Sequence, residues 1–448
     1  MDYQLLAAVL FGIALLLFLI LRLKLQAFIA LLIVSIVVGA LGGLGPEVIL
    51  ESIKNGMGGT LGFVATVVGL GALFGAVLEH SGGAQQLAGY LLNKFGEKRA
   101  PWSIMLTGFL VAIPVFFDVA FIILIPLIYA LQKRTGKSLL LYALPLLAGL
   151  AITHAFIPPT PGPIAVADIL NADLGWVIVF GFVVGLPAAV VAGPIFAKRI
   201  SDKLFISVPI ETEVSKVEIE NPPAVGVILS IIFLPIVLIV FNTVFNSPLT
   251  EGLVLPEWVI YMVGLLGHPF SALIIANLLA WYILGIRRNT SKATLLDIST
   301  KALYPAGVII LLTGAGGAFK QILIDTGAGT MIANALSSDY FPPVVFGFII
   351  AAIVRVMQGS STVAMITAAG ITAPIIASND YSAMQTAILV IAIASGASIF
   401  SHVNDSGFWL VKQYLGLTEK QTFRSWSIMT TLIAVTGLIM TTILWYLV

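Results

Sequence analysis

The sequence contains no cysteine and few charged residues. Its 448 residues are 59% hydrophobic and only 10% charged, whereas soluble globular domains carry about 25% charge. The absence of cysteine excludes disulfide bonds, thiolate metal sites and thiol nucleophiles. A net charge of +1 gives no reason to expect nucleic acid or another polyanion as a partner. The scarcity of charge predicts a polytopic membrane protein in contact with a lipid bilayer.

Several catalytic and cofactor motifs are also missing. The sequence has no Walker A motif, no HExxH, no nucleophile elbow and no dinucleotide-binding fingerprint. We therefore expect no enzyme, no cofactor and no metal, and uphill transport would draw on an ion gradient. The segment MDYQ has no basic residue, and no small-residue cleavage pattern follows the first apolar run, so we expect this run to be retained as a span.

Apolar runs recur along the whole chain, each near the roughly 20 residues that a crossing helix needs. The expected crossings are Tyr3 to Leu21, Leu25 to Leu41, Leu61 to Leu78, Leu139 to Leu170, Trp176 to Ala197, Ala224 to Phe245, Trp258 to Ile286, Leu303 to Leu323, Met384 to Leu410 and Trp426 to Leu447. Two more stretches, 102–131 and 344–376, are too long for one simple span and carry polar or helix-breaking residues near their middle. Each is predicted to be a re-entrant hairpin.

The positions of basic residues predict the topology. Cytoplasmic loops are enriched in Lys and Arg, and the clusters at Lys94/Lys98/Arg99 and Lys133/Arg134/Lys137 flank the first interrupted stretch on both sides. That hairpin should therefore enter and leave from the cytoplasm. The second is flanked by Asp325, Asp339 and Asp380 and should enter from outside. Both termini are then expected outside.

The two halves of the chain resemble each other. GLGALFGAVLEHSGGAQQLA, from Gly69, aligns without gaps on GAGGAFKQILIDTGAGTMIA, from Gly314. Five crossings and one hairpin per half would place the second copy upside down in the membrane. This predicts an all-α protein of two inverted repeats with broken helices, an architecture of secondary transporters. The expected parts are 1–197 (hairpin 102–131, broken helix 139–172), a cytoplasmic linker at 198–223, and 224–448 (hairpin 344–376, broken helix 384–411).

The first half carries two polar breaks. In IPVFFDVAF, Pro114 removes a backbone donor and Asp118 is a carboxylate near the middle of an apolar stretch, which marks a functional candidate. A role in capping the returning helix is the structural alternative. In THAFIPPTPGP the prolines interrupt the helix, so Thr160 must face protein or water. His154 precedes this break and is a candidate proton relay or substrate donor, or else an interior structural histidine.

The second half carries matching breaks. SGASIFSHVNDSG holds Ser401, His402, Asn404 and Asp405 inside an apolar span. Asp405 is the second candidate for proton coupling, Ser401 and Asn404 are candidate substrate ligands, and His402 has a supporting role. Capping of two half-helices is the alternative for this cluster.

The stretch RVMQGSSTVAM forms the centre of the second hairpin. Its turn would present amide and hydroxyl donors at a helix N-terminus, which suits an anion. These candidate substrate ligands are Gly359, Ser360, Ser361 and Thr362. Gln358 and Arg355 are supporting candidates, and Arg355 lies about 10 Å along the helix from Thr362, so it need not touch the ligand. A small-residue helix contact is the alternative.

The motifs FFDVAF, HAFIPPTPGPIA, QGSSTVAMITAAGI and SHVNDSGFW resemble those of the gluconate:proton symporter (GntP) family, over essentially the whole chain. Many relatives have Glu in the first hairpin where this chain has Asp118. The resemblance implies a bacterial inner-membrane permease for gluconate or another small carboxylate such as D-serine. It also implies a moving transport domain beside a scaffold that forms a homodimer.

The combined expectation is proton-coupled uptake of a sugar-acid monoanion. The hairpin tip would hold the carboxylate, Asp118 or Asp405 would carry the proton, and His154 would supply a second protonatable group if uptake is electrogenic. The alternatives are sodium coupling, a passive channel, and an intramembrane hydrolase that uses Ser361 and His402.

Overall fold

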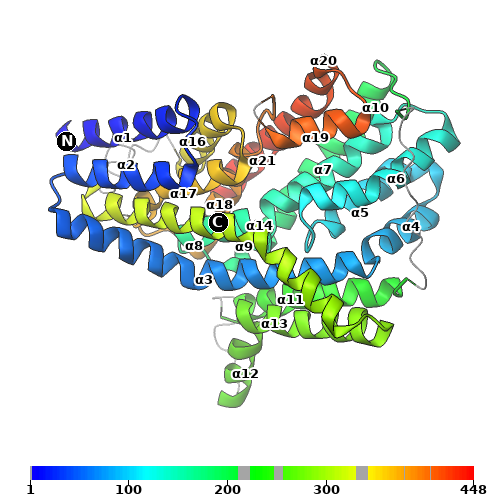
Figure 1. Ribbon diagram of the computed structural model, residues 1–448, viewed down its shortest axis with the longest axis horizontal. Helices are drawn as coiled ribbons and strands as arrows, with labels where there is room; N and C mark the ends of the chain where they lie inside the picture. Colours follow the sequence, from blue (N-terminus) through cyan, green and yellow to red (C-terminus); the bar gives the residue numbers. More distant parts are fainter. Residues whose placement is uncertain (1–2, 210–221, 247–255, 329–341, 378, 404) are drawn as a thin grey trace.

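The computed structural model describes residues 3–209, 222–246, 256–328, 342–377, 379–403 and 405–448. Every regular element among these residues is a helix (Figure 1). The helical stretches long and apolar enough to cross a membrane are Pro46–His80, Leu140–Ile169, Leu174–Ser201, Val225–Phe245, Pro269–Arg288, Lys292–Asp325 and Glu419–Trp445. Shorter apolar helices accompany them. The chain is therefore an all-helical multi-pass membrane protein, as its composition predicted.

Two long helices form the spine of the fold (Figure 1). These are α3 (Pro46–His80) and α14 (Lys292–Asp325), which pack against each other along their lengths in antiparallel directions. The backbones approach closely because small residues face each other: a Cβ on Gly56 would lie 2.5 Å from the Gly317 carbonyl oxygen. Both helices begin well before the crossings expected at Leu61 and Leu303. Their early turns carry charged residues, so hydropathy detects only the apolar part of each helix.

The first half contains a hairpin of two helices and one helix that is interrupted at its middle. The hairpin helices are α5 (Ala100–Val111) and α6 (Phe117–Thr135), and the interrupted helix consists of α7 (Leu140–Phe156) and α8 (Pro161–Ile169). Pro114 lies between α5 and α6, where it has no N–H to continue a helix. Its carbonyl abuts α3 at Gly75, where a Cβ would lie only 2.0 Å from the oxygen. A glycine in α3 therefore lets the first hairpin reach the spine.

The second half also contains a helical hairpin and an interrupted helix. The hairpin helices are α16 (Pro343–Gln358) and α17 (Ser361–Ala377), and the interrupted helix consists of α18 (Ala383–Gly396) and α19 (Ser406–Leu415). The α16–α17 turn depends on Gly359, whose φ of +90° is costly for a residue with a Cβ. In both halves the first hairpin helix packs on the first part of the interrupted helix, α5 on α7 and α16 on α18.

The remaining helices surround these parts. They are α1 (Tyr3–Leu21), α2 (Ala27–Leu41), α4 (Gly83–Phe95), α9 (Leu174–Val190), α10 (Phe196–Ser201), α11 (Val225–Phe245), α12 (Glu257–Gly267), α13 (Pro269–Ala280), α20 (Glu419–Thr422) and α21 (Ile428–Trp445). Short π-helical segments occur at Val191–Ile195, Trp281–Gly285 and Phe423–Ser427, and short 3-10 segments at Glu97–Arg99 and Ile286–Arg288.

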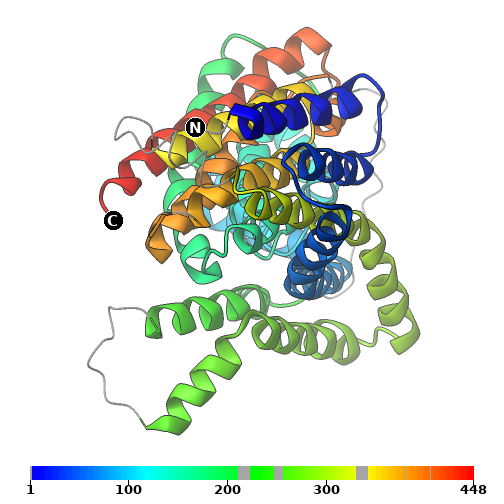
Figure 2. The ribbon, with the colours of Figure 1, turned by 90° about the vertical axis from the view of Figure 1, so that its left-hand side faces the viewer.

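Helices α11 to α13 form an arm along one side of the molecule (Figure 2). The expected crossing from Trp258 to Ile286 is two helices, because the chain turns at His268, whose Nδ1 accepts a bond from the Phe270 amide at 3.3 Å. Helix α12 points away from the bundle (Figure 2), and its Trp258 is 69% exposed. This arm presents apolar side chains to the surroundings.

Candidate functional site

One cavity of about 570 Å³, called the central cavity below, lies where the hairpins and the interrupted helices meet. Its walls come from the start of α6, the C-terminal end of α7, the α16–α17 turn, the start of α19 and the adjoining faces of α14 and α21. The cavity therefore joins segments of both halves that are far apart in the sequence. Its size lies within the range of pockets for small molecules.

Asp118 faces this cavity from the first turn of α6. It makes no capping bond: Phe116 is the N-cap residue, and no described residue is hydrogen-bonded to the Asp118 carboxyl group. Its charge interacts unfavourably with that of Asp405 across the cavity. Capping therefore does not explain Asp118, which remains available to a proton or a substrate.

Arg355 and Asp405 form a buried ion pair at the cavity wall. Arg355 Nη2 lies 2.5 Å from Asp405 Oδ2, and the two side chains are only 6% and 12% exposed. Arg355 Nη1 also donates to the Gly359 carbonyl at the hairpin turn. The sequence indicates only a supporting role for Arg355, because it lies about 10 Å from Thr362 along the helix axis. In the structure its side chain extends along the helix and reaches the turn. Its Nε is buried with no partner among the described residues.

Further donors hold the Asp405 carboxylate in place. Oδ1 accepts from the Gly407 amide at 3.0 Å, and Oδ2 accepts from the Ser401 hydroxyl. The Trp426 indole N–H in turn donates to Ser401 Oγ at 2.6 Å. These bonds fix the position and orientation of the carboxylate. Asp405 therefore caps α19 and neutralises Arg355 at the same time.

The α16–α17 turn points the N-terminus of a 17-residue helix into the cavity. Gln358 Oε1 accepts from the Ser360 amide at 2.8 Å, and Ser360 Oγ accepts from the Val363 amide at 3.3 Å. Ser361 and Thr362 also line the cavity. The first amides of a helix have no acceptor within the helix. Together with the positive end of the helix dipole, they make the start of α17 a favourable place for a carboxylate.

His154 lies on α7 and lines the same cavity. Its ring meets the edge of the Phe116 ring, with centroids 6.3 Å apart. Its Nδ1 is buried and has no hydrogen-bond partner among the described residues. A buried polar atom without a partner is uncommon, so this nitrogen is available to a substrate hydroxyl.

Other predicted ligands lie elsewhere. Thr160 does not line this cavity, and its hydroxyl donates to the Ile157 carbonyl at 2.6 Å. Ser401 does not line the cavity either, and its hydroxyl donates to the Asp405 carboxylate. His402 also does not line the cavity, and its Nε2 lies 2.8 Å from the Val356 carbonyl oxygen. Asn404 lies outside the described residues. His402 lies near a backbone carbonyl and is absent from the wall that holds Ser361, so the structure does not bring these two residues together as a base and a nucleophile.

Sequence reasoning missed another polar group. Asp168 on α8 interacts electrostatically with Lys320 on α14 and lies near Thr60 on α3. A signal was present, since both charged residues interrupt expected apolar crossings. This pair links an interrupted helix to the spine.

The whole chain has relatives of known class. Residues 4–448 match the GntP family permease family. The chain belongs to this family. It is 40% identical over 428 residues to the low-affinity gluconate transporter of Escherichia coli K12 (96% of this chain, 95% of the relative), and 38% identical over 442 residues to a gluconate permease of Pseudomonas aeruginosa (98% and 97%). The permease is thus a transporter of the inner membrane and not an enzyme.

A solved structure supports the fold of the permease. The Neisseria gonorrhoeae protein MtrF, described as one of a class of antimetabolite efflux pumps, has a TM-score of 0.67 with this chain at 16% identity. The match covers 93% of this chain and 94% of MtrF. Identity this low shows similarity of fold alone.

Proposed function

We propose that this permease takes up gluconate or a closely related sugar acid together with protons. The observation that carries the proposal is the cavity that places the N-terminus of α17, the Arg355 guanidinium and the unbonded Asp118 carboxyl around one space. Two of these groups attract a carboxylate, and the third can hold a proton. Relatives named as a gluconate transporter and a gluconate permease align with this chain along nearly its whole length, at 40% and 38% identity.

The substrate carboxylate would bind at the hairpin tip, to the first amides of α17 and to the Ser361 and Thr362 hydroxyls. The Arg355 Nε is close enough to the turn to contribute, because its guanidinium already contacts Gly359. The polyol chain would extend toward His154, whose free Nδ1 can accept from a hydroxyl.

Asp118 would be the coupling group. Asp405 is already matched by Arg355, so its charge is compensated with or without substrate. The charge of Asp118 has no such partner among the described residues, and it would repel an incoming anion until a proton neutralises it. Proton and anion would therefore occupy the site together. One proton with one monoanion carries no net charge, and His154 would supply a second proton site if uptake is electrogenic.

Uptake by proteoliposomes tests this proposal. With an imposed pH gradient and no sodium, radiolabelled gluconate is expected to accumulate, and a sodium gradient alone is expected to have no effect. The substrate should be recovered intact from the vesicles. Accumulation driven by sodium alone would favour the alternative coupling ion, and equilibration without accumulation would indicate a channel.

Thr362→Val is expected to weaken gluconate binding about tenfold or more. The change removes one hydroxyl donor to a charged ligand, and such a bond contributes about 1.5–3 kcal/mol. Isothermal titration of the purified protein measures the dissociation constant. Thr367→Val is the matched control, because Thr367 lies on the same helix with a buried hydroxyl that bonds to no described residue. Equal affinity of the Thr362 variant and the unmodified protein would contradict binding at the tip.

We further propose two inverted repeats, both termini on the outer (periplasmic) face of the membrane, and a homodimer. The matched packing of α5 on α7 and of α16 on α18 supports the repeat. The apolar arm supports the dimer, since Trp258 and Tyr261 of α12 are 69% and 68% exposed. Light scattering of the purified protein tests the dimer, and accessibility of a cysteine added at each terminus of this cysteine-free chain tests the orientation.

A further inference from the structure

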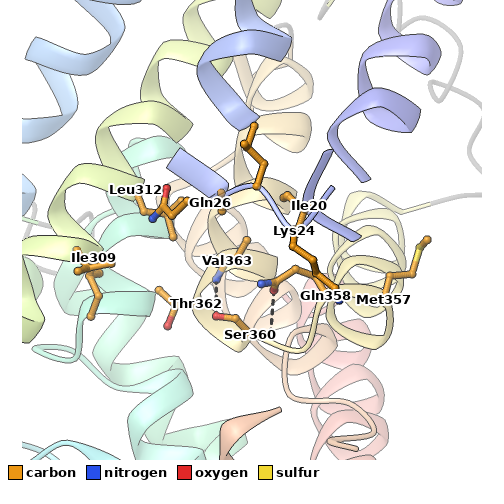
Figure 3. Close-up of a pocket in the computed structure, with 13 residues that line it drawn as sticks. Ile20, Lys24, Gln26, Ile309, Leu312, Met357, Gln358, Ser360, Thr362 and Val363 are labelled. Atoms are coloured by element: carbon orange, nitrogen blue, oxygen red, sulfur yellow. Dashed lines mark hydrogen bonds between the residues drawn. The ribbon is translucent and has the colours of Figure 1, made fainter. Parts of the chain in front are cut away.

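A second cavity of about 530 Å³ lies on the other side of the α16–α17 turn. It is bordered by the turn, by α14 and by the loop between α1 and α2, which brings Lys24 and Gln26 close to the hairpin tip (Figure 3). We refer to this space as the side cavity. It is large enough to hold a small organic anion.

The side cavity and the central cavity share part of their walls. Ile309, Gln358, Ser360 and Thr362 line both. Figure 3 shows Gln358, Ser360 and Thr362 on the hairpin turn, with Lys24 beside them. The hairpin tip is therefore the partition between the two spaces, and its polar groups are presented to each of them. The two cavities are therefore adjacent across the tip.

The two cavities differ in charge. The central cavity is lined by two carboxylates, Asp118 and Asp405, and one guanidinium, Arg355, so its formal charge is −1 when both carboxylates are ionised. In the side cavity Lys24 is the one charged side chain among the described lining residues. An anion is therefore attracted to the side cavity before the central site has been neutralised by a proton.

We propose that the side cavity is a vestibule on the cytoplasmic side, where the proposed topology puts the loop between α1 and α2, and that Lys24 attracts a small monocarboxylate there and exchanges it with the hairpin tip. The inference rests on the proposed function, since it takes the central cavity as the destination. A cation at the mouth of a cleft raises the rate of association more than it changes the rate of dissociation. Lys24 would thus raise the association rate constant and leave the dissociation rate constant nearly unchanged.

Stopped-flow binding of gluconate to the purified protein tests the proposal, with the change in intrinsic tryptophan fluorescence as the signal, since Trp426 lines the central cavity. Lys24→Asn is the variant of choice. Lys24 has a φ of +57°, and Asn tolerates that conformation better than most residues, so the charge is removed without backbone strain. The association rate constant is expected to fall about threefold or more at low ionic strength, with the dissociation rate constant unchanged. The difference should vanish in high salt, where charges are screened over about 3 Å.

Two controls define the result. Lys24→Arg keeps the charge and should bind at the unmodified rate. Lys292→Asn removes an exposed lysine sixteen residues before Val308 on α14, about 24 Å along the helix axis from the side cavity, and should also bind at the unmodified rate.

Three outcomes overturn the proposal. The first is an unchanged association rate for Lys24→Asn at low salt, and the second is a change confined to dissociation. The third is an effect seen only in bilayers that contain anionic lipid and not in neutral detergent, which would assign Lys24 to a lipid headgroup. Failure of the unmodified protein to bind gluconate at all would instead refute the proposed function, so the two failures are distinguishable.

Discussion

Asp118→Asn is expected to abolish proton-driven accumulation of substrate and to leave substrate exchange across the membrane intact. Asparagine is neutral at every pH, so the variant resembles the protonated carrier and accepts the anion without a proton. An imposed pH gradient of one unit, worth about 1.4 kcal/mol per proton, supports about tenfold accumulation in a one-to-one symporter. The variant should reach no accumulation. Uptake and counterflow in proteoliposomes measure the two activities separately.

Asp297→Asn is the matched control for this experiment. Asp297 lies on α14, is more than half exposed and pairs with Lys301 at 2.7 Å, and it does not line the central cavity. Its loss should leave accumulation unchanged. If Asp118→Asn accumulates substrate as well as the unmodified protein, Asp118 is not the coupling group, and Asp405 becomes the remaining candidate carboxylate of the cavity.

Arg355→Gln is expected to abolish binding and to destabilise the protein. The substitution leaves Asp405 buried without its cation, and breaking a buried ion pair in this way costs about 3–5 kcal/mol. It also removes the positive charge that faces the hairpin turn. Thermal unfolding measures the first effect, and titration with gluconate measures the second.

The double variant Arg355→Gln/Asp405→Asn separates these two effects. Neutralising both partners removes the unpaired charge, so most of the lost stability should return. Binding should remain absent if the guanidinium holds the substrate carboxylate. Recovery of normal affinity in the double variant would show that Arg355 serves only to neutralise Asp405.

The motifs that line the central cavity could be picked out from the sequence, since polar residues inside apolar runs stand out against a low charge content. Asp118, Asp405 and the Gly359 to Thr362 turn were predicted in this way, and all of them line that cavity. The pairing of Arg355 with Asp405 was not predictable. The two residues are fifty positions apart on different helices, and no local pattern links them.

Some predicted ligands have other bonding partners for a similar reason. Thr160 and His402 were grouped with the site because they lie beside helix breaks. Breaks expose carbonyl oxygens, and each of these side chains lies within hydrogen-bonding distance of one of them, Ile157 O and Val356 O. Proximity in sequence to a break therefore does not tell whether a side chain faces the cavity or bonds to the exposed backbone.

The sequence by itself determined that this is a helical membrane transporter with interrupted helices, because lipid allows only apolar helical spans and makes every polar break conspicuous. Only the tertiary structure decided which polar groups meet. Arg355 reaches Asp405, Asp118 is left without a described partner, and Lys24 stands beside the hairpin tip because of the packing of α3, α14 and the two hairpins. Contacts between residues far apart in the sequence depend on how the helices pack against one another. The spacing of residues along the chain does not show that packing.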